Sequence, residues 1–259
     1  MGILDRESYI STLDPWGDLK KYTAARIALG RAGGSLPTSE WLDFKLAHAK
    51  ARDAVHCEFN SEKLLADLKV LGYDMRVVSS QVSDRATFLQ RPDLGRRLNK
   101  ESVAIIEAEK TEADLVFIIS DGLSATAVHE NAVNLLKRLL PKFNPLIWTI
   151  APLVIAHFGR VALEDEIGAL IGAKTAVMLI GERPGLGSPN SLGAYIVYNP
   201  RRGNTDADRN CVSNIRPAGL DYSQAADTLF YLLDQAKRRK LSGVKLKDDR
   251  KMLEGLEEG

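Results

Sequence analysis

The sequence contains little cysteine and little histidine, with two cysteines and four histidines among 259 residues. Two cysteines are too few for the disulfide framework of a small secreted protein, so we expect a reducing compartment. The histidines stand at positions 48, 56, 129 and 157. None pairs with another at the spacing of three or four residues that a helix-borne metal site uses. We therefore expect no metal-ligating residue in this chain.

An excess of charge of one sign is also absent, because 35 lysines and arginines balance 34 aspartates and glutamates. A net charge of +1 creates no whole-chain field that would attract nucleic acid or an acidic membrane. Apolar runs stay short of the roughly 18 residues of a membrane-spanning helix. Acidic residues stand at positions 5 and 7, where a secretory signal would be basic and then apolar. Neither nucleic acid nor a membrane is an expected partner.

Hydrophobic periodicity divides the chain into two regions. The first hundred residues are predicted to be mainly helical, with helices over residues 19–29, 38–55 and 61–72 and a strand over residues 75–81. From about residue 102, strands alternate with helices. Strands are predicted over residues 113–120, 146–158, 175–180 and 194–198, and helices over residues 124–139, 162–171 and 221–236. This alternation predicts an α/β fold with helices on both faces of a mostly parallel sheet.

A glycine-rich loop is the clearest sign of a ligand site. Residues 181–187, Gly-Glu-Arg-Pro-Gly-Leu-Gly, follow an apolar run that is predicted to be a buried strand. Glycines let a ligand approach the backbone closely, and Glu182 and Arg183 stand at the tip of the loop. No lysine completes a P-loop, and Asn190 stands where a dinucleotide fingerprint needs its third glycine. The loop predicts a site at the edge of the sheet without naming its ligand.

Two further features leave alternatives open. Residues 90–98 contain three arginines beside a proline and a glycine. We favour a solvated loop leading into a helix, while a clamp for an anion or carboxylate is the alternative. Cys211 has no histidine near it in the sequence, so a small, partly buried side chain is favoured over a nucleophile.

Five segments along the chain carry a family resemblance. They are Gly-Arg-Ala-Gly at 30–33, Arg-Pro-Asp-Leu-Gly-Arg-Arg-Leu at 91–98, Ile-Ser-Asp-Gly-Leu-Ser at 119–124, the glycine-rich loop at 181–187, and Ala-Asp-Arg-Asn-Cys-Val-Ser-Asn-Ile at 207–215. In this order they resemble the small subunit of ethanolamine ammonia-lyase, and the resemblance runs from about residue 18 to residue 243. It implies a Rossmann-like domain over residues 101–259, preceded by a smaller, mainly helical region over residues 1–100 that contacts a partner.

The resemblance implies a subunit of an adenosylcobalamin-dependent lyase that converts ethanolamine to acetaldehyde and ammonia. Catalytic residues and most of the ethanolamine site are expected on the large subunit, with the cobalamin between the two chains. On this chain the resemblance implies three cobalamin-binding residues, Val161, Glu182 and Cys211. We expect Val161 to pack on the apolar part of the corrin, Glu182 to accept hydrogen bonds from amide groups, and Cys211 to fill space. Cys211 is expected in a loop region after the fourth strand.

The resemblance also leads to expectations about how the cofactor is bound and where the complex is located. None of the four histidines stands in an Asp-x-His-x-x-Gly motif, so a bound cobalamin is expected to keep its own lower base. About 17 residues precede the matched region, which favours a free bacterial cytoplasmic complex, with enclosure in a bacterial microcompartment as the alternative.

Two competing functions remain, a stand-alone Rossmann-type nucleotide-binding enzyme and a structural adaptor. The missing phosphate motifs speak against the first and the glycine-rich loop against the second.

Overall fold

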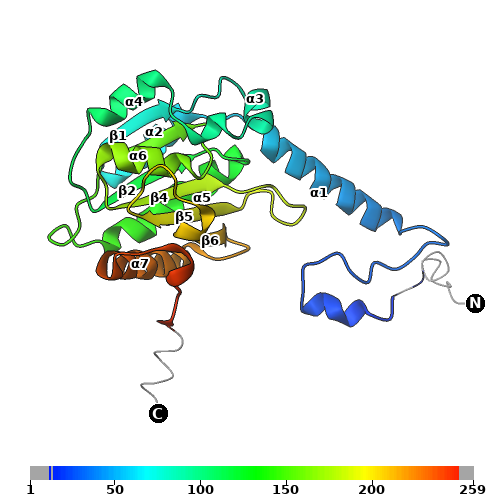
Figure 1. Ribbon diagram of the computed structural model, residues 1–259. Helices are drawn as coiled ribbons and strands as arrows, with labels where there is room; N and C mark the ends of the chain where they lie inside the picture. Colours follow the sequence, from blue (N-terminus) through cyan, green and yellow to red (C-terminus); the bar gives the residue numbers. More distant parts are fainter. Residues whose placement is uncertain (1–11, 13, 251–259) are drawn as a thin grey trace, which may run out of the picture.

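A computed structural model describes residue 12 and residues 14–250 (Figure 1). Within this part of the chain, six strands form one sheet in the order β1-β3-β2-β4-β5-β6. The first four strands in this order run parallel, and β5 runs antiparallel to both β4 and β6. The sheet is therefore mixed. The strands are β1 (Met75–Ser79), β2 (Leu115–Ser120), β3 (Leu153–His157), β4 (Thr175–Gly181), β5 (Leu192–Tyr198) and β6 (Arg209–Ile215).

Helices cover both faces of this sheet, which confirms the predicted α/β class. One face packs against α2 (Ser61–Leu68), α5 (Ala125–Leu139) and α7 (Tyr222–Arg239) in one hydrophobic core. The other face packs against α4 (Lys100–Glu107) and α6 (Leu163–Ile171) in a second core. Successive strand residues point to opposite faces, so Phe117 belongs to the first core and Ile118 to the second. The remaining helices are α1 (Thr38–His56) and α3 (Arg85–Gln90).

The sequence explains where the main helices begin and end. The hydroxyl of Ser124 accepts a hydrogen bond from the amide of Ala127 and so caps α5. The carboxylate of Asp221 caps α7 in the same way. Gly172 ends α6 in the left-handed conformation, with φ of +83°, which glycine adopts without strain. Short 3-10 turns also occur at Gly17–Lys21, Lys69–Leu71, Leu94–Arg96, Leu140–Lys142, Asp206–Asp208 and Gly243–Lys245.

Part of the first hundred residues packs with the sheet. Strand β1 pairs with β3, and Leu64 and Leu68 of α2 are completely buried in the first core. Helix α1 differs, because Ala54 is the one buried residue among its 19. In Figure 1, α1 leads away from the helices and strands of the body. The predicted domain boundary at residue 100 stays a prediction.

Several predicted elements were wrong, and each has a local reason. The predicted helix over residues 19–29 is replaced by the short turn Gly17–Lys21, because its apolar positions, such as Tyr22, have no core to pack against. The strand predicted from residue 146 begins only at Leu153, since the side chain of Leu146 points into solvent. Cys211 lies in β6, not in a loop region. Strand β6 was missed because its asparagines are poor strand formers.

Close backbone packing joins the turns that follow β2 and β4. The amide of Leu123 donates to the carbonyl of Gly181 over 2.9 Å. A Cβ atom on Gly181 would overlap the carbonyl oxygen of Ser124 and lie 2.5 Å from that of Asp121. Glycine at 181 is therefore required by the contact between the two turns. Gly187, in the same loop, has no atom within 4 Å of such a Cβ.

We predict that Gly181→Ala lowers the free energy of unfolding by about 1–3 kcal/mol, because the added methyl group forces the two turns apart. Gly187→Ala is the matched control and is expected to change stability by less than about 0.5 kcal/mol, as surface substitutions do. Urea denaturation followed by circular dichroism measures both values. Equal stabilities of the two variants would contradict the steric role assigned to Gly181.

Candidate functional site

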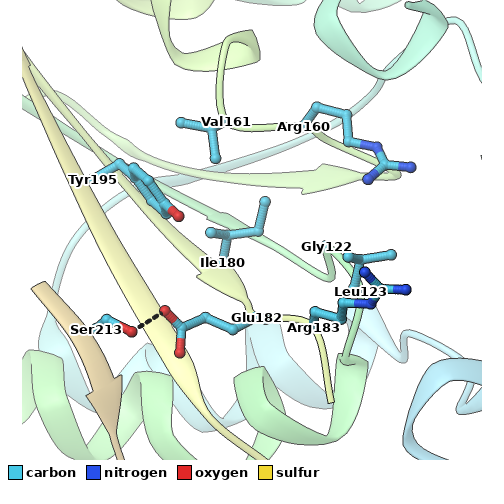
Figure 2. Close-up of a pocket in the computed structure, with 10 residues that line it drawn as sticks. Gly122, Leu123, Arg160, Val161, Ile180, Glu182, Arg183, Tyr195 and Ser213 are labelled. Carbon is cyan, nitrogen blue, oxygen red and sulfur yellow. Dashed lines mark hydrogen bonds between the residues drawn. The ribbon is translucent and has the colours of Figure 1, made fainter. Parts of the chain in front are cut away.

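A cavity of about 430 Å3 opens where the turns after β2, β3 and β4 meet strands β5 and β6 (Figure 2). The ends of the parallel strands meet here, which is the usual ligand site of an open α/β sheet. Val161 and Glu182 both line the cavity, so the structure brings together two of the three residues that the sequence singled out. The complete lining is Gly122, Leu123, Arg160, Val161, Ile180, Gly181, Glu182, Arg183, Tyr195 and Ser213.

The carboxylate of Glu182 links the end of β4 to β6. The Ser213 hydroxyl donates to Glu182 Oε1 over 2.5 Å, and Figure 2 shows the side chain turned toward it. The Ser191 hydroxyl and the Asn214 amide both donate to Oε2, the amide over 3.2 Å. A carboxylate has about four acceptor positions, so three are used and one on Oε1 remains unused. A Cβ on Gly193 would lie 2.9 Å from Oε1, so that glycine makes room for the carboxylate.

An apolar wall faces Glu182 across the cavity. Val161 and Ile180 pack on the second hydrophobic core, and Figure 2 shows both beside Tyr195. Burial raises the pKa of the Tyr195 phenol above its usual range, so the ring stays neutral at physiological pH. The cavity therefore combines a neutral, apolar side with one carboxylate acceptor.

Cys211 lies beside this cavity but is not part of its lining. It stands directly opposite Tyr195 in the ladder between β5 and β6, on the same strand face as Ser213. One side of the residue reaches solvent. Removal of water from the thiol by its neighbours raises the pKa of Cys211, which keeps the sulfur protonated near pH 7. A protonated thiol is a poor nucleophile, which supports the space-filling interpretation.

A buried carboxylate fixes the turns after β2 and β3. Asp121 Oδ1 accepts from the amide of Phe158 over 2.7 Å, and Oδ2 accepts from Arg85 Nη1 over 3.1 Å. Burial raises the pKa of Asp121 to about 6, against the lowering effect of the Arg85 charge. Arg85 also donates to the carbonyls of Gly122 and, at the end of α1, Val55. One guanidinium group thus connects the cavity to the base of the projecting helix.

Comparison with known proteins identifies the family. The model of the ethanolamine ammonia-lyase light chain matches residues 13–247. The ethanolamine ammonia-lyase small subunit of Pseudomonas putida strain GB-1 is 52% identical over 240 residues, which cover 91% of this chain and 88% of the relative. The small subunit of Azotobacter vinelandii strain DJ is 51% identical over 243 residues, covering 92% and 90%.

The chain belongs to the ethanolamine ammonia-lyase light-chain family. It is therefore a subunit of a lyase complex, and a small subunit implies a larger partner chain. This confirms the resemblance that the five sequence segments indicated. Among the described residues, no helix is both long and apolar enough to cross a membrane.

Sequence reasoning missed several cavity residues of this light chain. Tyr195 lies within an apolar strand, so the sequence gave no reason to single it out. Its position opposite Cys211 in the β5–β6 ladder identifies it as a residue of the site. Ser213 stands two residues after Cys211, so recognition of β6 as a strand would have placed both on one face. Arg160 directly precedes Val161 and gave no separate signal in the sequence. These residues come together through strand pairing that the sequence does not show.

Two acidic residues in the first turn of α6 share one arginine. Arg209 Nη1 donates to Glu164 Oε1 over 3.0 Å and to Asp165 Oδ1 over 2.8 Å, and Nη2 donates to Asp165 Oδ2 over 2.6 Å. Glu164 is completely buried, and this burial raises its pKa to about 8. At neutral pH, Glu164 therefore keeps its proton and accepts from Arg209 as a neutral carboxyl group.

We predict that Glu164 makes the light chain less stable as the pH rises from about 4.5 to 8. Below pH 4.5 the carboxyl is protonated in both states; within the window, the unfolded chain loses this proton and the folded chain retains it. Because the folded state then binds more protons, the free energy of unfolding falls with pH. Glu164→Gln is expected to flatten this slope in urea denaturation at pH 5, 6, 7 and 8.

Glu101→Gln, on the exposed first turn of α4, is the matched control and should keep the wild-type slope. Parallel pH curves for wild type and Glu164→Gln would show that Glu164 is ionised in the folded state.

Proposed function

We propose that this chain binds adenosylcobalamin together with the large subunit of ethanolamine ammonia-lyase, which converts ethanolamine to acetaldehyde and ammonia. The catalytic residues and most of the ethanolamine site are assigned to the large subunit. Family membership supports the complex, and the acceptor position left on Glu182 supports a ligand at this cavity. The Rossmann-like assignment of the sheet belongs to the same proposal, since the cavity lies at the ends of its parallel strands.

The residues of the cavity fit a corrin. A corrin is a large plate with apolar faces and a rim of amide side chains, and the cavity offers an apolar wall beside a carboxylate. Its volume of about 430 Å3 suits a small ligand and is too small for the whole cofactor. The chain therefore receives one part of the cobalamin, and the partner has to enclose the rest. When bound, the group supplies a cobalt–carbon bond that breaks homolytically and starts radical chemistry.

Each of the three proposed contact residues has one task. Val161 packs on the apolar part of the corrin and excludes water from it. Glu182 accepts a hydrogen bond from a corrin amide through the free position on Oε1, while Ser213 and Ser191 hold its orientation. Cys211 fills space beside Tyr195 as a neutral thiol. These tasks bind and orient the cofactor and leave the chemical steps to the other subunit.

The competing functions explain less. A stand-alone nucleotide enzyme would need a phosphate loop, and a light-chain family member is a subunit, not a complete enzyme. A purely structural adaptor would need no carboxylate held at the edge of an open cavity. Location in the bacterial cytoplasm, free or inside a microcompartment, belongs to the proposal as well.

We also propose that α1 and the residues before it contact the large subunit. Trp41, Leu42 and Leu46 on α1 each expose about half of their surface, and Tyr22 exposes 85%. A helix whose apolar side chains lie in water gains little from packing within its own chain. Exposed aromatic and aliphatic residues that gather on one segment are typical of a protein interface.

We predict that Glu182→Gln weakens binding of adenosylcobalamin to the complex of both subunits by about 1.5–3 kcal/mol, roughly tenfold to a hundredfold. The amide has only one oxygen, so it cannot accept from Ser213, from Asn214 and from a corrin amide together. Equilibrium titration of the purified complex, followed by the cobalamin absorbance, gives the affinity. The exposed Glu101→Gln is the control, and an unchanged affinity for Glu182→Gln would count against its role.

We predict that the double substitution Leu42→Glu and Leu46→Glu weakens assembly with the large subunit at least about tenfold, because two apolar contacts are replaced by charges. Glutamate is a good helix former, so α1 itself is expected to persist. Val70→Glu, at an equally exposed apolar position on the body, is the control. Sedimentation velocity of the mixed subunits measures assembly; wild-type association of the double variant would exclude this face from the interface.

A further inference from the structure

A second cavity, of about 490 Å3, adjoins the first and shares Arg160 and Val161 with it. Its lining includes Arg96, from the arginine-rich segment whose role the sequence left open. Arg209 also lines it, but this arginine is paired with Asp165, at the start of α6, over 2.6 Å. The second cavity therefore presents two arginines, Arg96 and Arg160, beside the proposed corrin site.

The loop that carries Arg96 is fixed against Arg160 by backbone contact. The amide of Arg160 donates to the carbonyl of Gly95 over 2.7 Å. A Cβ on Gly95 would lie 2.8 Å from Cγ of Arg160 and 3.0 Å from the carbonyl oxygen of Phe158. A side chain at 95 would therefore force Arg160 to shift. The two arginines are thus held next to each other by the fold.

Neither arginine has a carboxylate partner among the residues that the structure describes. The other two arginines of the segment do: Arg91 pairs with Asp93 at 2.7 Å, and Arg97 lies 3.8 Å from a carboxylate oxygen of Glu166. Asp206 is the one acidic residue in the lining of the second cavity, and its side chain is fully exposed. Positive charge therefore exceeds negative charge at this edge.

Arg160 also keeps hydrogen-bonding capacity unused. Its guanidinium stacks 4.0 Å from the centre of the Phe88 ring, and Nη2 donates to the Phe88 carbonyl over 2.7 Å. The buried Nε has no hydrogen-bond partner. Removal of water, together with the charges of Arg85 and Arg96, lowers the pKa of Arg160 from its usual value, against the raising effect of the Asp121 charge. A nearby anion would relieve this repulsion and accept from Nη1, which makes no hydrogen bond among the described residues and is not among the buried atoms.

We propose that Arg96 and Arg160 form an anion subsite that binds the phosphodiester of the nucleotide tail of cobalamin. The proposal rests on the proposed function, because the subsite is continuous with the cavity assigned to the corrin. Cobalamin carries a single phosphodiester, on the flexible tail that leads from the ring to its lower base. Because Val161 lines both cavities, a corrin packed on Val161 would have the second cavity, with its two guanidinium groups, within reach of that tail.

Cobinamide provides the test, since it has the same corrin ring without the nucleotide and its phosphate. Wild-type complex, Arg96→Ala, Arg160→Gln and the control Arg91→Ala are each titrated with adenosylcobalamin and with adenosylcobinamide. We expect Arg160→Gln to weaken cobalamin binding about tenfold and the more exposed Arg96→Ala about threefold. Cobinamide binding should be unchanged in Arg96→Ala and should weaken less than cobalamin binding in Arg160→Gln, because Arg160 also lines the first cavity. Arg91→Ala, whose guanidinium faces Asp93, should bind both corrinoids as wild type does.

The possible outcomes separate this proposal from the proposed function. A wild-type complex that binds neither corrinoid would refute the cofactor assignment itself. A wild-type complex that binds both, with variants that weaken both equally or neither, would overturn only the anion subsite. Sedimentation of the complexes without corrinoid is the last readout. Loss of assembly in Arg96→Ala would assign that arginine to a subunit contact and overturn the proposal too.

Discussion

Backbone contact between the turns after β2 and β4 positions the cavity. Gly122 and Gly181 approach so closely that a side chain on either one would overlap the other turn. This contact fixes the point at which the chain leaves β4, and Glu182 is the next residue. The hydroxyl of Ser213 then ties Glu182 to β6, two strands away in the sheet. The close packing of these two glycines therefore determines where the carboxylate of Glu182 lies.

Charge is balanced inside the domain and unbalanced at its edge. The buried Asp121 is matched by Arg85, and Asp165 is matched by Arg209. An unmatched charge in such surroundings would cost several kcal/mol, so these pairs are conditions for folding more than sources of stability. Arginines without carboxylate partners occur at the rim of the cavities instead, where a ligand or another chain can approach. The buried, paired charges therefore maintain the fold, whereas the unpaired arginines at the rim are available for binding.

The sequence predicted much of the fold and part of the site. Alternating apolar strands and helices gave the α/β class, and the glycine-rich loop gave the position of Glu182. Strand order and pairing were not predictable, because they depend on contacts between distant segments such as β1 and β3. For the same reason Tyr195 and Ser213 gave no signal, since they join the site only through the β4–β5–β6 ladder. The apolar periodicity of residues 19–29 predicted a helix that does not form, because no core is present there to support it.

The most direct test of the account is a structure of the complex of both subunits with adenosylcobalamin bound. We expect the corrin to contact Val161 and to place one rim amide about 3 Å from Oε1 of Glu182. The rest of the cofactor should be enclosed by the large subunit. A cobalamin seated away from the turns after β3 and β4 would contradict the account.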